Sequence, residues 1–103
     1  MAVLERMEKE AKALLETLER GDRAAVDAAQ RRFSQTVAEA WDRYQQGGIA
    51  VAVQGLPRVM YQWAVEELPQ QVQDPAQWPK VRRELARFLR TMRWVVEPEE
   101  REE

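Results

Sequence analysis

The chain has 103 residues and a formal net charge of −2, and 45% of its residues are hydrophobic. It contains no cysteine and no histidine, which excludes disulfide bonds, cysteine-ligated metal sites, and catalysis by a histidine base or a cysteine nucleophile. No apolar run approaches the roughly 20 residues of a membrane span. We therefore expect a cytoplasmic binding protein rather than an enzyme, with no catalytic, cofactor or metal site and no membrane contact.

The first half of the sequence predicts two antiparallel helices. Apolar residues recur every three or four positions over 2–20 and again over 23–46, which is the spacing of one face of an α-helix. Gly21 can end the first helix in a left-handed conformation, and Asp22 can cap the second helix by accepting from its free amides. So short a connection leaves room only for a tight hairpin.

The segment 49–53 is ambiguous. Its β-branched residues suit a strand, but no other part of the sequence offers it a convincing partner, and a lone strand is unstable. We interpret it as a short buried helix, with an extended conformation as the alternative. After a break near Gly55 and Pro57, a third helix is expected over 57–68, ended by Pro69.

The last third of the sequence predicts a stiff connection and one more helix. Residues 69–79 contain three prolines, and Asp74 is spaced to cap a single turn within this connection. A fourth helix follows over 79–96, where apolar residues again repeat every three or four positions. Residues 97–103 carry five glutamates and one arginine, so we expect an acidic, disordered tail there.

Together these elements predict an all-α fold, a four-helix bundle or a close variant, with a break in the third helical segment near Gly55-Pro57. Residues 1–96 are expected to form a single helical domain, and 97–103 are expected to lie outside it.

The strongest functional signal is a basic row on the fourth helix. At about 100° per residue, its members fall on one narrow face, opposite the apolar residues. They are Lys80, Arg83, Arg87, Arg90 and Trp94. Arginine grips phosphate oxygens and tryptophan offers a stacking plane, so this face is a candidate for nucleic acid or another acidic partner. The alternatives are a protein-facing surface or an ordinary solvated helix face, over which the acidic tail could fold.

A second signal comes from the aromatic residues. Four tryptophans are many for this length, and large aromatic residues are common both in cores and at protein interfaces. The candidate protein interface on the third helix comprises Arg58, Met60, Tyr61 and Trp63. Because the flank 49–53 is also apolar, we expect a homodimer, or a small subunit of a larger assembly. For Trp41 and Trp63, burial in the core is favoured over a place on an interface, and Trp78 is expected to pack the connection 69–79 against the bundle.

Two stretches resemble parts of the small all-helical subunits of type III CRISPR effector complexes. One is similar to their glycine-leucine break followed by an apolar helix, and the other to their basic C-terminal helix. The residues that carry the resemblance are Gln54, Gly55, Leu56, Gln62, Trp63 and Ala64, and then Arg82, Leu85, Ala86, Arg93 and Trp94. This chain is shorter than such subunits and ends acidic. The resemblance implies a nucleic-acid-associated role.

The sequence therefore favours a non-catalytic helical interaction module. The alternative is a nucleic-acid-associated small subunit that uses the basic row.

Overall fold

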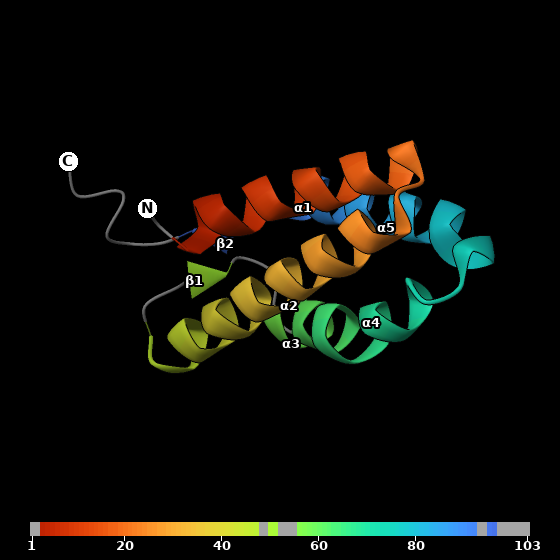
Figure 1. Ribbon diagram of the computed structural model, residues 1–103. Coiled ribbons are helices and arrows are strands. Elements are labelled where there is room, and N and C mark those ends of the chain that lie inside the picture. Colours follow the sequence, from red (N-terminus) through yellow and green to blue (C-terminus); the bar gives the residue numbers. More distant parts are fainter. Residues whose placement is uncertain (1–2, 48–49, 52–55, 93–94, 97–103) are drawn as a thin grey trace.

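The computed structural model describes residues 3–47, 50–51, 56–92 and 95–96, which form four helical segments and one pair of very short strands (Figure 1). The first two segments are α1 (Val3–Arg20) and α2 (Arg23–Gln45). The third is continuous and consists of α3 (Leu56–Tyr61), a π-helix η1 (Gln62–Glu67) and α4 (Leu68–Gln71). The fourth consists of a 3-10 turn η2 (Pro75–Gln77) and α5 (Trp78–Thr91). The strands are β1 (Ala50–Val51) and β2 (Val95–Val96).

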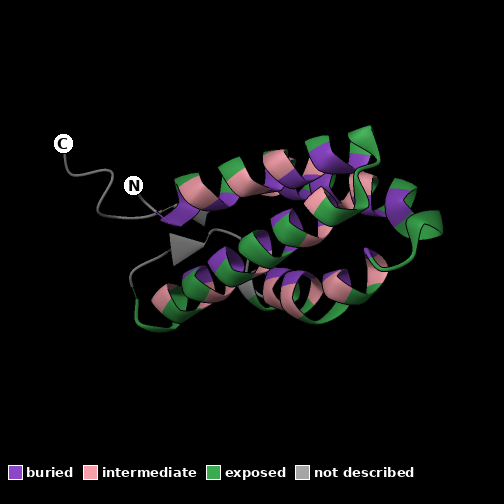
Figure 2. Cartoon of the chain, viewed as in Figure 1, coloured by how far each residue is buried: buried purple, intermediate pink, exposed green. Residues whose placement is uncertain are grey.

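Successive helical segments run in opposite directions and enclose one core (Figure 1). The helix α1 packs against α2 and α5, α2 packs against the third segment, and α4 contacts α5. Figure 2 shows that the buried side of each helix faces these neighbours. The predicted all-α class is confirmed, and the arrangement is consistent with the expected helical bundle.

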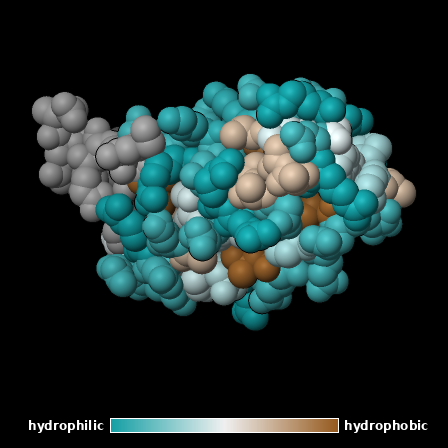
Figure 3. Space-filling model, in the orientation of Figure 1, coloured by the Kyte–Doolittle hydropathy of each residue, from teal (hydrophilic) through white to brown (hydrophobic). Residues whose placement is uncertain are grey.

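Every helical segment contributes to the core. Its largest fully buried side chains are Phe33, Met7, Leu14, Leu68, Leu85, Val3, Val26 and Val81. The face seen in Figure 3 is mostly hydrophilic, and its hydrophobic side chains form separate spots rather than one continuous area. Burial of these apolar residues is the main driving force for the fold.

The turn between α1 and α2 forms as predicted. Gly21 has a φ of 74°, and its amide donates to the carbonyls of Thr17 and Leu18 at 3.1 and 3.2 Å. The Asp22 carboxylate accepts from the Ala25 amide at 3.2 Å. A left-handed residue and an N-cap thus satisfy backbone groups at both helix ends.

The helical interpretation of 49–53 is wrong at the two residues of this segment that the structure describes. Ala50–Val51 is extended and pairs antiparallel with Val95–Val96, with Ala50 opposite Val96. The partner strand was missed because 95–96 had been assigned to the fourth helix, whereas α5 ends at Thr91. Valine favours extended backbone, and the pairing supplies hydrogen bonds that a lone strand would lack.

Pro69 does not end the third helix, contrary to expectation. The segment continues to Gln71 through the π-helix, where the Leu68 amide donates to the carbonyl of Trp63, five residues earlier. Pro69 then falls in the first turn of α4, where its missing amide costs little. The predicted break near Gly55 lies outside the described residues. The next residue, Leu56, is described and begins α3.

The wide turns of η1 also fit the spacing of buried residues. Met60, Ala64, Leu68 and Val72 follow one another every fourth position and are all buried. On an α-helix each such step overshoots a full turn by about 40°, so three steps drift by about 120°. Because a π-helix bonds to the fifth residue rather than the fourth, its turns are wider and reduce this drift.

Candidate functional site

Four of the five predicted members of the basic row project from one face of α5. Lys80, Arg83, Arg87 and Arg90 are all exposed, and they line a single surface hollow of about 470 Å³. Steps of three and four residues bring them together, because α5 turns about 100° per residue. The fifth predicted member, Trp94, lies outside the described residues.

The four basic side chains have no ion pair with any residue that the structure describes. Among the described residues, the carboxylates of Glu8, Asp27 and Glu39 form ion pairs, and they lie on α1 and α2. Of the described acidic residues, Glu84 alone lines the hollow beside the row. Like charges that are not neutralised locally create a positive potential along this face, although the whole chain has a pI near 5.3.

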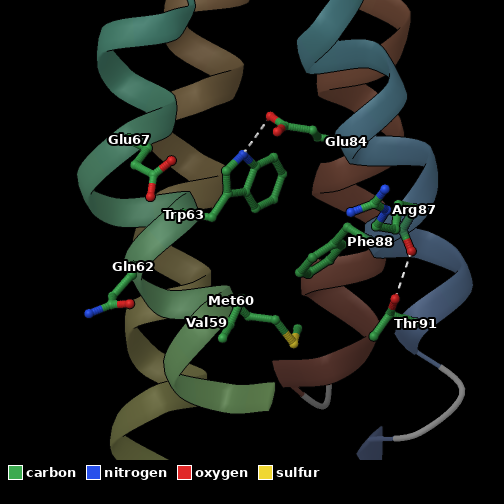
Figure 4. A pocket seen from close by; sticks show the side chains of 9 residues that line it. All are labelled: Val59, Met60, Gln62, Trp63, Glu67, Glu84, Arg87, Phe88 and Thr91. Carbon is green, nitrogen blue, oxygen red and sulfur yellow. Dashed lines mark hydrogen bonds between the residues drawn. The ribbon is translucent and has the colours of Figure 1, made fainter. Parts of the chain in front are cut away.

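A second hollow lies between α5 and the third helical segment, and we call it the aromatic groove (Figure 4). Its volume is about 290 Å³. The lining residues are Val59, Met60, Gln62, Trp63, Glu67, Glu84, Arg87, Phe88 and Thr91. Glu84 and Arg87 line both this groove and the basic hollow, so the two sites are adjacent on one helix.

The aromatic rings of the groove are held by the core beneath them. The Trp63 and Phe88 ring centroids are 5.8 Å apart. Phe33, which is fully buried, contacts both rings edge-on at 5.9 and 5.1 Å. The indole Nε1 of Trp63 donates to the Glu84 carboxylate at 3.0 Å (Figure 4). Because packing and a hydrogen bond both fix Trp63, the groove is preformed.

The predicted protein-interface residues of the third helix do not share one open surface. Arg58 is exposed, whereas Met60 is 9% exposed and belongs to the core. Tyr61 is half-buried and stacks on Trp41 at a centroid distance of 5.2 Å. Trp63 is partly buried and packs against the core. Met60 and Trp63 line the aromatic groove instead.

Sequence reasoning missed the groove because two distant segments form it. Phe88 belongs to the apolar face of the predicted fourth helix, and nothing in the sequence indicates that it meets Trp63. Val59, which is 63% exposed at the groove, was not singled out. Glu67 and Glu84 resembled ordinary surface charges. A sequence signal for this site would have required knowledge of how α5 packs beside η1.

Comparison with known proteins finds no matching family model, no matching curated protein and no matching solved structure. Among the residues that the structure describes, no helix has the length and apolar character needed to cross a membrane. Within the same residues, no group of three or more acidic side chains is placed to hold a metal ion. The site is therefore interpreted from its own geometry.

Proposed function

We propose that this chain is a non-catalytic helical interaction module that binds an anionic partner through the basic row of α5. The supporting observation is that Lys80, Arg83, Arg87 and Arg90 are exposed, share one hollow, and have no ion-pair partner among the described residues. A cytoplasmic location and membership of a larger assembly belong to the same proposal.

Nucleic acid is the anionic partner that this row suits best. Three of its four described members are arginines, whose planar guanidinium groups bind phosphate oxygens with two parallel hydrogen bonds. The row extends over ten residue steps of α5, or about 15 Å of helix, which is long enough to contact several phosphates.

Binding of labelled oligonucleotides by fluorescence polarisation, at several salt concentrations, tests the proposal. Four phosphate contacts predict that log K falls with log salt concentration with a slope of about −3. The double variant Arg87→Glu/Arg90→Glu should abolish binding and leave the helical circular dichroism unchanged. Its matched control is Arg20→Glu/Arg32→Glu, which changes two exposed arginines of α1 and α2 by the same charge.

The two variants separate a specific face from a general charge effect. Equal loss of affinity in both would contradict the assignment of the row as the binding surface. No saturable binding even at low salt would refute the nucleic-acid proposal, and the search would then move to acidic protein partners.

Self-association through α3 is a second candidate, supported by one observation. Val59 is a large hydrophobic residue with 63% exposure, and it lies next to the exposed Arg58. If α3 is a dimer interface, Val59→Asp should shift the protein to monomer in sedimentation velocity. A wild-type chain that stays monomeric at high concentration would rule this candidate out.

A further inference from the structure

We propose that the partner is a single-stranded nucleic acid, one base of which enters the aromatic groove while its phosphates follow the basic row. This inference rests on the proposed function, because it assumes that the row binds phosphates. It adds a second contact, made by the base rather than by the backbone of the strand.

The two hollows are placed so that one strand can reach both. Arg87 lines both of them, and the next residue, Phe88, lies at the base of the groove. Consecutive helical residues point about 100° apart. The face of α5 that carries Arg87 therefore adjoins the face that carries Phe88 and lines the groove. When Arg87 binds a phosphate, the base of that nucleotide can turn into the groove toward Trp63.

The groove has the composition of a base-binding site. Trp63, which is partly buried, offers aromatic surface, and the buried side chains of Phe88 and Met60 line the groove beside it. Stacking on aromatic side chains is the usual way in which proteins hold unpaired bases. Glu67 lines the same groove, and its carboxylate can accept a hydrogen bond from the edge of a base.

The size of the groove limits what can enter it. Its volume of about 290 Å³ lies at the lower end of the range for small-molecule pockets. That space suits one planar ring system, whereas an amphipathic helix would need a longer groove for several anchoring side chains. An acidic protein segment would use the basic row, but it would fill the groove only if it also carried an aromatic side chain to lay against Trp63.

The charges around the groove favour one strand over two. The basic row lies on α5, whereas the exposed Glu67 lies across the groove on η1. A duplex seated over both walls would bring its second row of phosphates toward this carboxylate, and its bases would be stacked inside and out of reach. A single strand can keep its phosphates on the α5 side.

The test compares three labelled probes of equal length on the wild-type protein: a single-stranded DNA, the same strand made abasic, and the duplex. The abasic strand carries the same phosphates without the stacking surface. We expect it to bind about 5- to 150-fold more weakly than the intact strand, which is the effect of losing one stacked base. We also expect the duplex to bind more weakly than the intact strand.

The outcomes distinguish this inference from the proposed function. Equal affinity for the intact and abasic strands would overturn base insertion and leave phosphate binding by the row in place. Tighter binding of the duplex than of the intact strand would overturn the single-strand preference. Failure of all three probes to bind at low salt would refute nucleic-acid binding by the basic row, on which this inference rests.

A pair of variants locates the base. Trp63→Leu should remove the preference for the intact over the abasic strand, measured as the ratio of the two affinities in the same variant protein. Trp41→Leu is the matched control, because Trp41 stacks with Tyr44 and Tyr61 away from the groove lining and should keep the preference. A Trp63→Leu protein that still prefers the intact strand would exclude the groove as the site of the base.

Discussion

Trp63 has two structural roles that are usually separate. Its ring contacts Phe33 and Phe88 in the core, and it also lines the aromatic groove. Its indole N–H is satisfied by Glu84, so this large side chain leaves no polar group unpaired at the edge of the core. Changes at Trp63 should therefore affect both stability and ligand binding.

Replacing Trp63 with Phe should lower the free energy of unfolding by about 1–2 kcal/mol. The variant keeps an aromatic ring but loses the hydrogen bond to the Glu84 carboxylate and some buried area. Urea denaturation followed by circular dichroism measures the change. Glu84→Gln is the control, because its amide oxygen can still accept from the indole, and it should have a smaller effect. A larger loss in Glu84→Gln would contradict this account of the contact.

The helical elements show which features local sequence rules can predict. The α1–α2 turn and the single turn after Asp74 were predicted from glycine, aspartate and proline positions, and the structure confirms both. The β1–β2 pair was missed because it joins residues about 45 positions apart. The continuation of the third helix past Pro69 was also missed, since it depends on the wide turns of η1.

The same distinction applies to the candidate site. The basic row was predicted because its residues lie on one helix and follow its periodicity. The aromatic groove could not be predicted in this way, since Trp63 and Phe88 come from segments that meet only in the folded protein. The part of the row at Trp94 stays a prediction, because it lies outside the described residues.

The α1–α2 turn depends on a left-handed backbone conformation at Gly21, and substitution of this residue tests that dependence. Gly21→Ala should lower the free energy of unfolding by about 1–2 kcal/mol, because the φ of 74° is left-handed and a side chain with a Cβ resists it. The added methyl group meets no atom within 4 Å, so steric contact with neighbours is not the cause. Thermal or urea denaturation measures the loss.

Gly21→Asn is the matched variant for this prediction. Asparagine tolerates the left-handed region better than other residues with a side chain, so it should cost less than alanine. If both variants lost the same free energy of unfolding, the left-handed conformation at position 21 would not be the cause of the loss.

Across the whole molecule, positive and negative charges are concentrated in different parts of the chain. The basic row lies on α5, while residues 97–103 carry five glutamates and one arginine, a net charge of −4 within a chain of net charge −2. Removing these residues would leave a net charge of +2 on 1–96. The uneven distribution means that the overall charge does not describe the field that a ligand meets at α5.

Deleting 97–103 should therefore strengthen binding of an anionic oligonucleotide. The loss of five carboxylates reduces repulsion of the approaching strand, and the effect should be largest at low salt, where charges are least screened. Fluorescence polarisation of the 1–96 chain against the full chain measures it. Replacing the five glutamates with glutamine is the control for length and should act in the same direction. Unchanged affinity at low salt would contradict the prediction.

Because η1 has wide turns, the third helical segment could lose one residue and keep the same buried face. Met60 and Leu68 are eight positions apart and both buried, whereas positions seven apart share one face of an ordinary α-helix. Removing a single residue between 62 and 67 would give that seven-residue spacing. The π-helix is thus equivalent to a one-residue insertion into a regular helix, and a relative lacking that residue would keep the same buried face.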